Sequence, residues 1–392
     1  MPILFFTKYT RAGASSRYRS FQYLPALEAA GLRVTVSPLF DEAYLAHKYA
    51  HGRASVGAVV RAFARRLWAV LTVPRAAVVV VEYELLPWFP AVLERWLAWR
   101  GCRMVVDYDD ALFHQYDAHP NPWVRRLLGR KIATVMRLAH TVVAGNAYLA
   151  GYARRAGAQQ VAMIPTVIDL ARYSVADVGG MKTSAVVQAM MAAPTDAGAG
   201  DAAKTEGAGP AARVFTIGWI GSPSTARYLR DIAPALAEVC RDGRARVRLV
   251  GSGPIELPGV PVEVVAWREE TEVDEIRGFD VGIMPLPDEP WARGKCGFKL
   301  IQYMACGLPV VASPVGVNAE IVEDGGNGFL AADAGAWVKA LEALREDAAL
   351  RDRMGAAGRQ RAEARYCLAV TAPQVVGVLR GQPGRVDRWG PV

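Results

Sequence analysis

The sequence predicts an α/β protein made of two doubly wound domains that face a common cleft. Short apolar runs of strand length alternate with helical stretches over residues 3–165, a pattern typical of parallel sheets covered by helices. An alanine- and glycine-rich stretch interrupts this alternation, which resumes at residue 214. The 392 residues are also too many for one ordinary core and suit two domains.

The first domain, residues 1–173, is expected to contain six strands. Each is an apolar run bounded by polar or glycine-containing turns. The runs lie at residues 3–7, 33–37, 77–82, 103–108, 141–145 and 161–165. The intervening segments 16–31 and 121–139 have helical periodicity.

The second domain, residues 213–365, repeats this alternation. Its expected strands lie at residues 214–221, 246–253, 262–267, 279–286 and 308–313. Residues 174–212 lack aromatic residues and any sustained period, which predicts a flexible linker. For residues 366–392 we expect a C-terminal helix and tail that can cross back to the first domain.

Positive charge is concentrated in the first domain. Residues 1–172 contain 22 Lys and Arg against 11 Asp and Glu, whereas the rest of the chain contains 24 against 27. A basic module favours phosphorylated ligands or anionic lipid. Nucleic acid is not expected as a partner, because no motif for binding it is present.

The cysteine pattern predicts a reducing, cytoplasmic location. The five cysteines are scattered without a CxxC pair, and no secretory segment precedes the first strand. No bilayer-spanning segment is expected, because the apolar runs are only strand-sized.

Residues 53–72 form a candidate basic amphipathic helix, in which Arg61, Arg65 and Arg66 are interspersed with apolar residues and Trp68. This pattern suits peripheral binding to the inner face of an anionic membrane. It suits equally well a helix packed on its own sheet with the arginines in water.

Two strand-to-helix turns are suited to binding an anion. The first, residues 7–19, has a small-residue loop around Gly13, then Ser15 or Ser16 as helix cap, with Arg17 and Arg19 beside it. An ordinary capped helix with solvated arginines is the alternative.

The second turn, residues 218–229, contains Gly221 and then Ser222, Ser224 and Thr225 at the start of a helix. This motif is weak by itself, since many strand-to-helix turns share it. Opposed across a cleft, however, the two turns could hold a diphosphate from both sides.

Residues 294–316 predict a helix that opens at Gly297 and ends near residue 307, followed by a buried strand. Lys299 and Gln302 lie three residues apart and share one face. Helix amides with Lys299, and Lys295 in the preceding loop, would stabilise negative charge on a leaving group. Gln302 can hydrogen-bond a sugar hydroxyl. A packing helix with Lys299 in solvent is the alternative.

The C-terminal half resembles the retaining glycosyltransferases of family 4 (glycosyl transferases group 1), which have the GT-B fold. The similarity runs from "GWIG" through "LVGSG" and "FDVGIMPL" and is most specific in "FKLIQYMACGLPVVASPVGVNAEIVEDGGNGFL". The N-terminal half is similar more loosely, through its first loop and "IPTVID". The resemblance implies two Rossmann-like domains facing a cleft, and sugar transfer from a nucleotide sugar with retained configuration. It also implies a saccharide or lipid-linked acceptor, such as a surface polysaccharide or glycolipid.

The resemblance also implies positions for two donor-site glutamates, eight residues apart. The second corresponds to Gln302, which would contact the nucleotide ribose. The first corresponds to Gly294, so Asp288 or Glu289 would have to replace it.

The family's basic residues beside the diphosphate fall near Trp219 and Ser224. We therefore expect Lys295 and Lys299 to supply that charge. The full set expected at the donor is Gly13, Ser15, Arg17, Gly221, Ser222, Ser224, Thr225, Lys295, Gly297, Phe298 and Gln302.

Residues 105–114 place Asp107, Asp109 and Asp110 at a strand end, followed by His114. An Asp-x-Asp pair could bind a metal together with a nucleotide sugar. It also matches the nucleophile and acid of haloacid-dehalogenase-type phosphatases, which bind Mg²⁺. Carboxylates paired with nearby arginines are a structural alternative.

We favour an acceptor-side role, in which Asp107 or His114 positions a hydroxyl and acts with Lys299 in catalysis. No metal and no cofactor beyond the nucleotide-sugar substrate is expected. The alternative functions are a metal-dependent phosphatase using Asp107 and Asp109, or a nucleotide-sugar-binding protein without catalysis.

Overall fold

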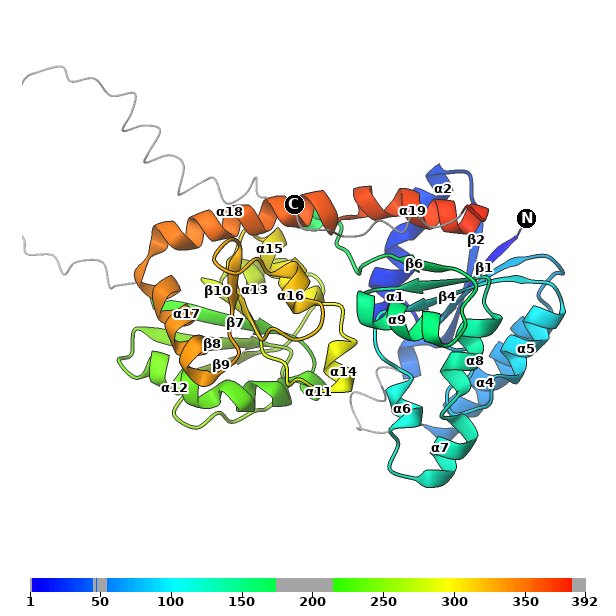
Figure 1. The fold of residues 1–392 in the computed structure, drawn as a ribbon, viewed down its shortest axis with the longest axis horizontal. Helices are drawn as coiled ribbons and strands as arrows, with labels where there is room; N and C mark the ends of the chain where they lie inside the picture. The colour runs from blue at the N-terminus through cyan, green and yellow to red at the C-terminus, as the bar shows by residue number, and fades with distance from the viewer. Residues whose placement is uncertain (1, 45–46, 48–54, 174–213, 383–392) are drawn as a thin grey trace, which may run out of the picture.

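The protein has two parallel α/β domains lying side by side (Figure 1). The computed structural model describes residues 2–44, 47, 55–173 and 214–382. The predicted linker at 174–212 lies outside the described residues, as do residues 53 and 54 of the predicted basic helix and the tail after residue 382.

The first domain contains a parallel sheet with the order β2-β1-β3-β4-β5-β6. Its strands are β1 (Ile3–Tyr9), β2 (Val34–Phe40), β3 (Val78–Glu82), β4 (Arg103–Tyr108), β5 (Thr141–Ala144) and β6 (Val161–Met163). These strands confirm the six predicted positions. β3 is buried along its whole length, as expected for a central parallel strand rich in valine.

Helices cover both faces of this sheet. They are α1 (Ala14–Arg19), α2 (Leu24–Ala29), α4 (Val56–Leu71), α5 (Val92–Trp99), α6 (His114–Asp117), α7 (Pro122–Leu128), α8 (Lys131–Leu138) and α9 (Ala147–Arg155). The predicted helix at 16–31 is divided by a 3₁₀ turn at Phe21–Tyr23, and Pro25 occupies the first turn of α2, where its missing N–H costs nothing. The predicted helix at 121–139 is likewise two helices, of which the first is capped by Asn121.

One residue of the predicted basic helix departs from expectation. Arg66 in α4 is buried, and its guanidinium donates to the carbonyl oxygens of Thr7 (2.7 Å) and Ser37 (2.9 Å). It therefore anchors α4 to its sheet. Arg61 and Trp68 remain exposed on the outer face of the helix.

The second domain has a parallel sheet with the order β12-β11-β10-β7-β8-β9. Its strands are β7 (Phe215–Ile220), β8 (Ala245–Val250), β9 (Val262–Val265), β10 (Val281–Met284), β11 (Val310–Ala312) and β12 (Gly328–Leu330). The five predicted strands are confirmed. The edge strand β12 was not predicted, because it begins with a glycine and contains only two apolar residues.

The helices of the second domain and the C-terminal segment follow in chain order. They are α11 (Pro223–Ala226), α12 (Ala233–Cys240), α13 (Glu272–Arg277), α14 (Pro290–Arg293), α15 (Phe298–Ala305), α16 (Asn318–Ile321), α17 (Ala334–Glu346), α18 (Ala348–Arg365) and α19 (Leu368–Arg380). No helix among the described residues combines the length and apolar character that a membrane span needs.

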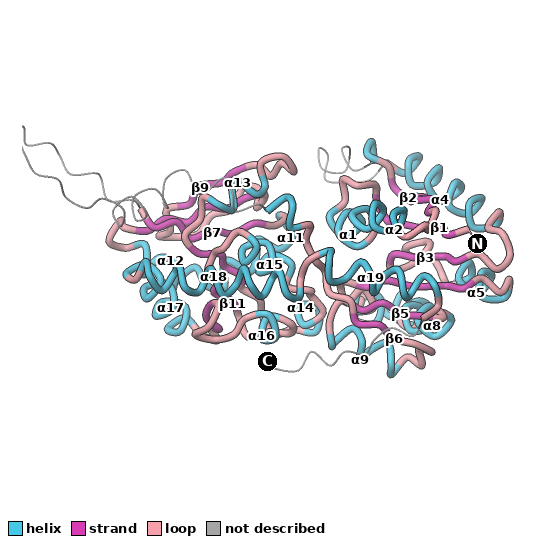
Figure 2. The backbone as a smooth tube through the Cα atoms, turned by 90° about the horizontal axis from the view of Figure 1, so that it is seen from above, coloured by secondary structure: helices cyan, strands magenta, loops and turns pink. Residues whose placement is uncertain are grey.

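The last helix, α19, lies against the first domain, as both ribbon views show (Figures 1 and 2). Tyr23 and Thr371 share a hydrogen bond of 2.9 Å between their hydroxyls, and Arg380 donates to the carbonyl oxygen of Ala30 at 2.8 Å. The chain thus joins the two domains at its C-terminal end, on the side where α18 passes into α19.

Candidate active site between the two domains

The loops after the carboxyl ends of the strands meet between the two domains. Ligands of doubly wound proteins bind at this edge of the sheet. The first domain contributes the loops after β1, β3, β4 and β5, and the second contributes those after β7, β9 and β10.

One group of contacts across the domain boundary centres on Glu272, at the start of α13. Its carboxylate accepts hydrogen bonds from Tyr18 (3.0 Å), Gln302 (2.9 Å) and Trp267 (2.7 Å). The amide nitrogen of Gln302 also donates to the Tyr173 hydroxyl at 3.1 Å. Both amide hydrogens of Gln302 are therefore used within the protein, so a ribose hydroxyl would meet only its oxygen or would have to displace one of these bonds.

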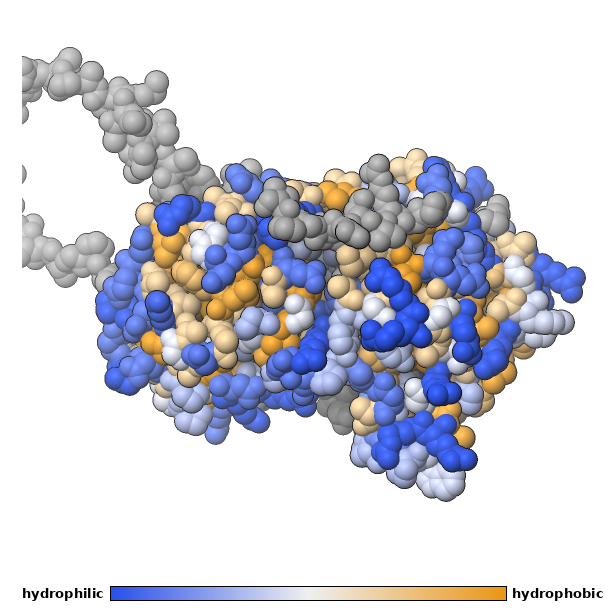
Figure 3. Space-filling model, in the orientation of Figure 1, coloured by the Kyte–Doolittle hydropathy of each residue, from blue (hydrophilic) through white to orange (hydrophobic). Residues whose placement is uncertain are grey.

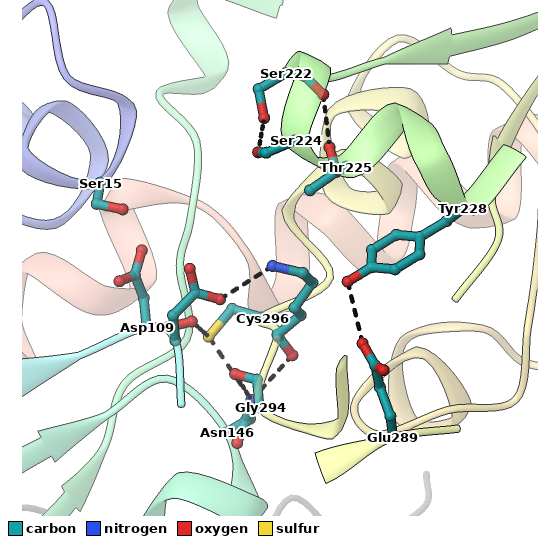
Figure 4. Close-up of polar contacts among 12 residues, drawn as sticks. Ser15, Asp109, Asn146, Ser222, Ser224, Thr225, Tyr228, Glu289, Gly294 and Cys296 are labelled. Atoms are coloured by element: carbon teal, nitrogen blue, oxygen red, sulfur yellow. Dashed lines mark hydrogen bonds and ion pairs between the residues drawn. The ribbon is translucent and has the colours of Figure 1, made fainter. Parts of the chain in front are cut away.

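A second group of contacts lies at the loop before α15 (Figure 4). Asn146 donates from its side-chain nitrogen to the carbonyl oxygens of Gly294 and Lys295, both at 2.9 Å. Lys295 pairs with Asp110 at 3.3 Å. The thiol of Cys296 donates to the Asp109 carbonyl oxygen at 3.0 Å.

The close approach of the domains explains the glycine at position 294. A Cβ atom there would lie 2.3 Å from the Ala111 Cβ of the other domain. No side chain fits without moving the two domains apart, so the first glutamate implied by the resemblance is excluded in this arrangement.

The two proposed replacements for that glutamate differ in position. Asp288 forms an exposed ion pair with Arg293 at 2.6 Å. Glu289 lies at the wall of the site and accepts a hydrogen bond from the Tyr228 hydroxyl at 3.3 Å (Figure 4). Glu289 is therefore the better placed of the two.

Lys299 lies in the first turn of α15, as predicted. Gly297, with φ of 63°, forms the left-handed cap before the helix, a conformation that favours glycine. The Lys299 ammonium lies 5.2 Å from the centre of the Trp219 ring and has no ion pair with any described residue. Burial, and then the positive charge of Lys295, lower the pKa of Lys299 to about 7.

A partly buried cation without an ion pair gains from an anionic ligand, because the ligand supplies an opposite charge in a site that is only partly open to water. The neighbouring Gly221 is part of the same arrangement. A Cβ atom there would lie 2.7 Å from the Cε of Lys299, so a larger residue would push the lysine away.

The serine-rich turn after β7 lies across an open space from Ser15 and Asp109 (Figure 4). The hydroxyls of Ser222 and Ser224 are 2.9 Å apart, and Thr225 donates to the Ser222 carbonyl oxygen at 3.1 Å. A helix begins at this turn as predicted: α11 has Ser222 as its N-cap and is four residues long.

The first-domain wall contains a strained residue that the sequence analysis missed. Tyr83 follows β3 with φ of 60°, a conformation that is rare for aromatic residues and is often found at functional sites. Its hydroxyl hydrogen-bonds the Asp109 carboxylate and lies 3.2 Å from the Ser15 oxygen. No sequence pattern marks a positive φ at a tyrosine, so only its position after a strand could have drawn attention to it.

The predicted cap of α1 is wrong in detail. The N-cap is Gly13, which has no side chain to offer, and Ser15 and Ser16 lie inside the helix. A Cβ at Gly13 would lie 2.5 Å from that of Tyr9, which accounts for the glycine. The Ser16 hydroxyl instead donates to the buried Glu82 carboxylate at 2.7 Å, and burial raises the pKa of Glu82 to about 7.

The two arginines of that turn are not free to bind a phosphate in this structure. Arg17 is only 2% exposed and pairs with Glu269 of the second domain at 2.8 Å. Arg19 is also buried, and its guanidinium donates to both carboxylate oxygens of Asp107, at 2.8 Å from Nε.

The predicted catalytic residues Asp107 and His114 are likewise occupied. Both Asp107 oxygens accept hydrogen bonds from Arg19, and the Asp107 side chain is buried, so this residue forms the carboxylate–arginine pair that was the structural alternative. The ring nitrogens of His114 contact Asp117 at 2.9 Å and Tyr148 at 2.8 Å. Asp109, which bonds to Tyr83, is the strand-end carboxylate that faces the open space (Figure 4).

Phe298, the remaining residue expected at the donor, contributes to the domain contact. Its ring lies 4.2 Å from the Tyr18 ring, centre to centre. The structure therefore brings together Ser15, Gly221, Ser222, Ser224, Thr225, Lys295, Gly297 and Lys299 around the cleft. Within the described residues, no three or more His, Cys, Asp or Glu side chains are grouped as metal ligands would be.

Comparison with known proteins supports the resemblance. Residues 212–347 match the family model described as glycosyl transferases group 1. Over 104 residues the chain is 36% identical to the D-inositol 3-phosphate glycosyltransferase of Arthrobacter sp. strain FB24. That match covers 24% of this chain and spans 23% of the length of the Arthrobacter protein.

Solved structures of glycosyltransferases share the fold over nearly the whole chain. Sucrose-phosphate synthase from Thermosynechococcus elongatus has a TM-score of 0.65 at 18% identity, covering 97% of this chain and 98% of its own. Anabaena HepE in complex with UDP and glucose has a TM-score of 0.64 at 17% identity, covering 97% and 100%. WaaG, a glycosyltransferase involved in lipopolysaccharide biosynthesis, has a TM-score of 0.64 at 14% identity with the same coverage. The GT-B fold expected from the sequence is confirmed.

Proposed function

We propose that the protein is a glycosyltransferase that moves a sugar from a nucleotide-sugar donor to a saccharide or lipid-linked acceptor. The observation that carries this proposal is the unpaired Lys299 in the first turn of α15, beside Lys295 and facing the serine-rich turn of residues 222–225. Family-level similarity of residues 212–347 supports the same conclusion.

The diphosphate of the donor is assigned to the space between Lys299, Lys295 and the turn at Ser222. In a transferase the leaving diphosphate gains charge in the transition state, so fixed positive groups at that place lower the barrier. Lys295 would exchange its 3.3 Å contact with Asp110 for the phosphate. Glu289 takes the place of the absent glutamate at position 294 and contacts the donor sugar.

Asp109 is assigned to the acceptor. Its carboxylate, held by the strained Tyr83, faces the cleft and can accept a hydrogen bond from the hydroxyl that attacks. We propose retention of configuration, in which the leaving phosphate takes the acceptor's proton on the face it departs from. This mechanism needs no enzyme nucleophile, no metal and no cofactor.

Two of the structurally similar proteins suggest a donor and an acceptor class for this chain. HepE has been solved with UDP-glucose, and WaaG takes part in lipopolysaccharide biosynthesis. By analogy we propose a UDP-sugar donor and a surface polysaccharide or glycolipid acceptor for this chain.

Helix α4 provides the proposed membrane contact. Val56 and Val60 are exposed with Trp68, which is 71% exposed, and Arg61 lies on the same helix. Apolar side chains beside arginines suit the interface of an anionic membrane. We propose that this protein is cytoplasmic and binds the inner membrane face through α4 while it glycosylates a lipid-linked acceptor.

The test is a thermal-shift screen with UDP-, GDP- and ADP-sugars, followed by transfer of the radiolabelled sugar into a membrane lipid fraction. We expect one nucleotide sugar to raise the melting temperature, with labelled lipid formed also in EDTA. If no nucleotide sugar stabilises the protein, the proposed function is wrong. If transfer stops in EDTA and returns with Mn²⁺, the metal-free mechanism is wrong.

A further inference from the structure

The first domain has a second concave site, away from the cleft. A pocket of about 600 Å³ lies between α5 and α8, and residues near the ends of α7 and α9 also line it. Figure 3 shows strongly hydrophilic side chains interspersed with apolar ones over this part of the domain. None of its lining residues belongs to the proposed donor or acceptor site.

All the charged residues that line this pocket are basic. Arg95 from α5, Arg130 and Arg137 from α8 and its cap, and Arg155 from α9 line it, and no acidic residue of the described chain does. The side chains of these four arginines form no hydrogen bond or ion pair with any described residue. Many other arginines of the described chain, such as Arg17 and Arg19, are paired with acids.

A fifth basic residue of the pocket lining, Lys131, is paired within the protein. The ammonium of Lys131 is turned inward, where it pairs with the buried Glu84 and donates to the Leu86 carbonyl oxygen at 2.6 Å. Only the four arginines are therefore available to a ligand. Arg130, Thr134 and Arg137 lie three to four residues apart along α8, so one helix face presents two guanidiniums and a hydroxyl to the pocket.

Four like charges around one hollow repel one another, and a multiply charged anion relieves that repulsion. Guanidinium groups suit phosphate in particular, because they offer paired N–H donors to its oxygens. The rim adds apolar surface, since Val92 is 53% and Leu127 is 71% exposed. We propose that this pocket is a binding site for a phosphate group of high negative charge, carried either by a lipid headgroup or by a soluble oligophosphate.

The test compares two double variants with the same change in net charge. Arg137→Gln/Arg155→Gln removes two pocket arginines. Arg126→Gln/Arg154→Gln removes two exposed arginines from α7 and α9 that do not line the pocket. Melting curves establish that both double variants fold. Two single variants at neighbouring positions repeat the comparison with a smaller perturbation: Arg155→Gln in the pocket and Arg154→Gln outside it.

Two probes distinguish the sources of the phosphate. Inorganic pyrophosphate is followed by hydrogen exchange of residues 127–137, which separates this pocket from any binding in the cleft. Phosphatidylcholine vesicles with and without phosphatidic acid are followed by co-sedimentation. We expect the pocket variant to bind at least one probe about tenfold or more weakly than the control variant, since a charge-assisted contact is lost.

The possible outcomes distinguish a soluble ligand, a lipid phosphate and the absence of a phosphate site. Pocket-specific loss of pyrophosphate protection supports the proposal with a soluble ligand. Pocket-specific loss of vesicle binding alone supports it with a lipid phosphate. If the two double variants behave alike with both probes, the pocket is not a phosphate site. None of these results depends on sugar transfer, so the proposed function and this inference stand or fall separately.

Discussion

The charge state of Lys299 should give the proposed donor site a specific pH dependence. Burial and Lys295 lower the pKa of this ammonium to about 7 in the free protein. Only the protonated lysine attracts a diphosphate, so donor affinity should fall as the pH rises through 7. UDP-glucose is the suitable ligand, because its diphosphate is esterified at both ends and keeps its charge near neutral pH.

The size of this effect follows from the pKa. One pH unit above the pKa, roughly a tenth of the lysine is protonated, so the affinity should be about tenfold lower at pH 8 than at pH 6. Bound diphosphate raises the pKa of Lys299, so binding takes up a proton above pH 7. Isothermal titration calorimetry in two buffers of different ionisation enthalpy measures both the affinity and this proton uptake.

Two substitutions of Lys299 test whether its charge causes this pH dependence. Lys299→Arg keeps its charge over this range and should give a flat profile, and Lys299→Ala should be flat with about ten- to a hundredfold lower affinity. Lys339→Ala, an exposed lysine of α17, is the control and should retain the pH dependence of the natural protein. An affinity of the natural protein that does not change between pH 6 and 8 would refute the assigned role of Lys299.

Three further predictions follow from the domain contacts and the acceptor wall. Gly294→Glu should separate the domains, because the new side chain would meet Ala111. Small-angle scattering should then show a larger radius of gyration, and an unchanged radius would contradict the steric argument. Arg19→Met should leave the buried Asp107 without its partner and lower the free energy of unfolding in urea by about 3–5 kcal/mol, whereas a loss below about 1 kcal/mol would mean that the pair is not structural. Asp109→Asn should lower kcat for sugar transfer about ten- to a hundredfold with little change in donor affinity, because the attacking hydroxyl loses a charge-assisted hydrogen bond. An equal loss of donor affinity would place Asp109 at the donor instead.

The sequence was sufficient to predict the fold because its signals are local. Valine-rich runs such as 78–82 mark central parallel strands, and a glycine before an amphipathic stretch marks the start of α15. Lys299 was identified because its place in the first turn of a helix follows from the chain alone. The edge strand β12 was missed because it begins with a glycine and contains only two apolar residues.

The contacts across the cleft were not predictable in the same way. Arg17 pairs with Glu269, which lies 252 residues further along the chain. Glu272 accepts hydrogen bonds from side chains of both domains. Nothing near Asp107 in the sequence indicates that Arg19 occupies it. The acidic cluster at 107–110 lies at the domain boundary, where Asp110 pairs with Lys295. That Asp107 is bound to Arg19 while the partly buried Asp109 faces the space between the domains follows only from the packing.

The donor site that we propose lies between the turn after β7 and the first turn of α15. Hydrogen exchange of the natural protein with and without UDP-glucose tests it most directly. We expect slower exchange in residues 219–226 and 295–303, and we expect Lys299→Ala to lose this protection at the same ligand concentration. Protection confined to other parts of the chain, or equal protection in Lys299→Ala, would contradict it.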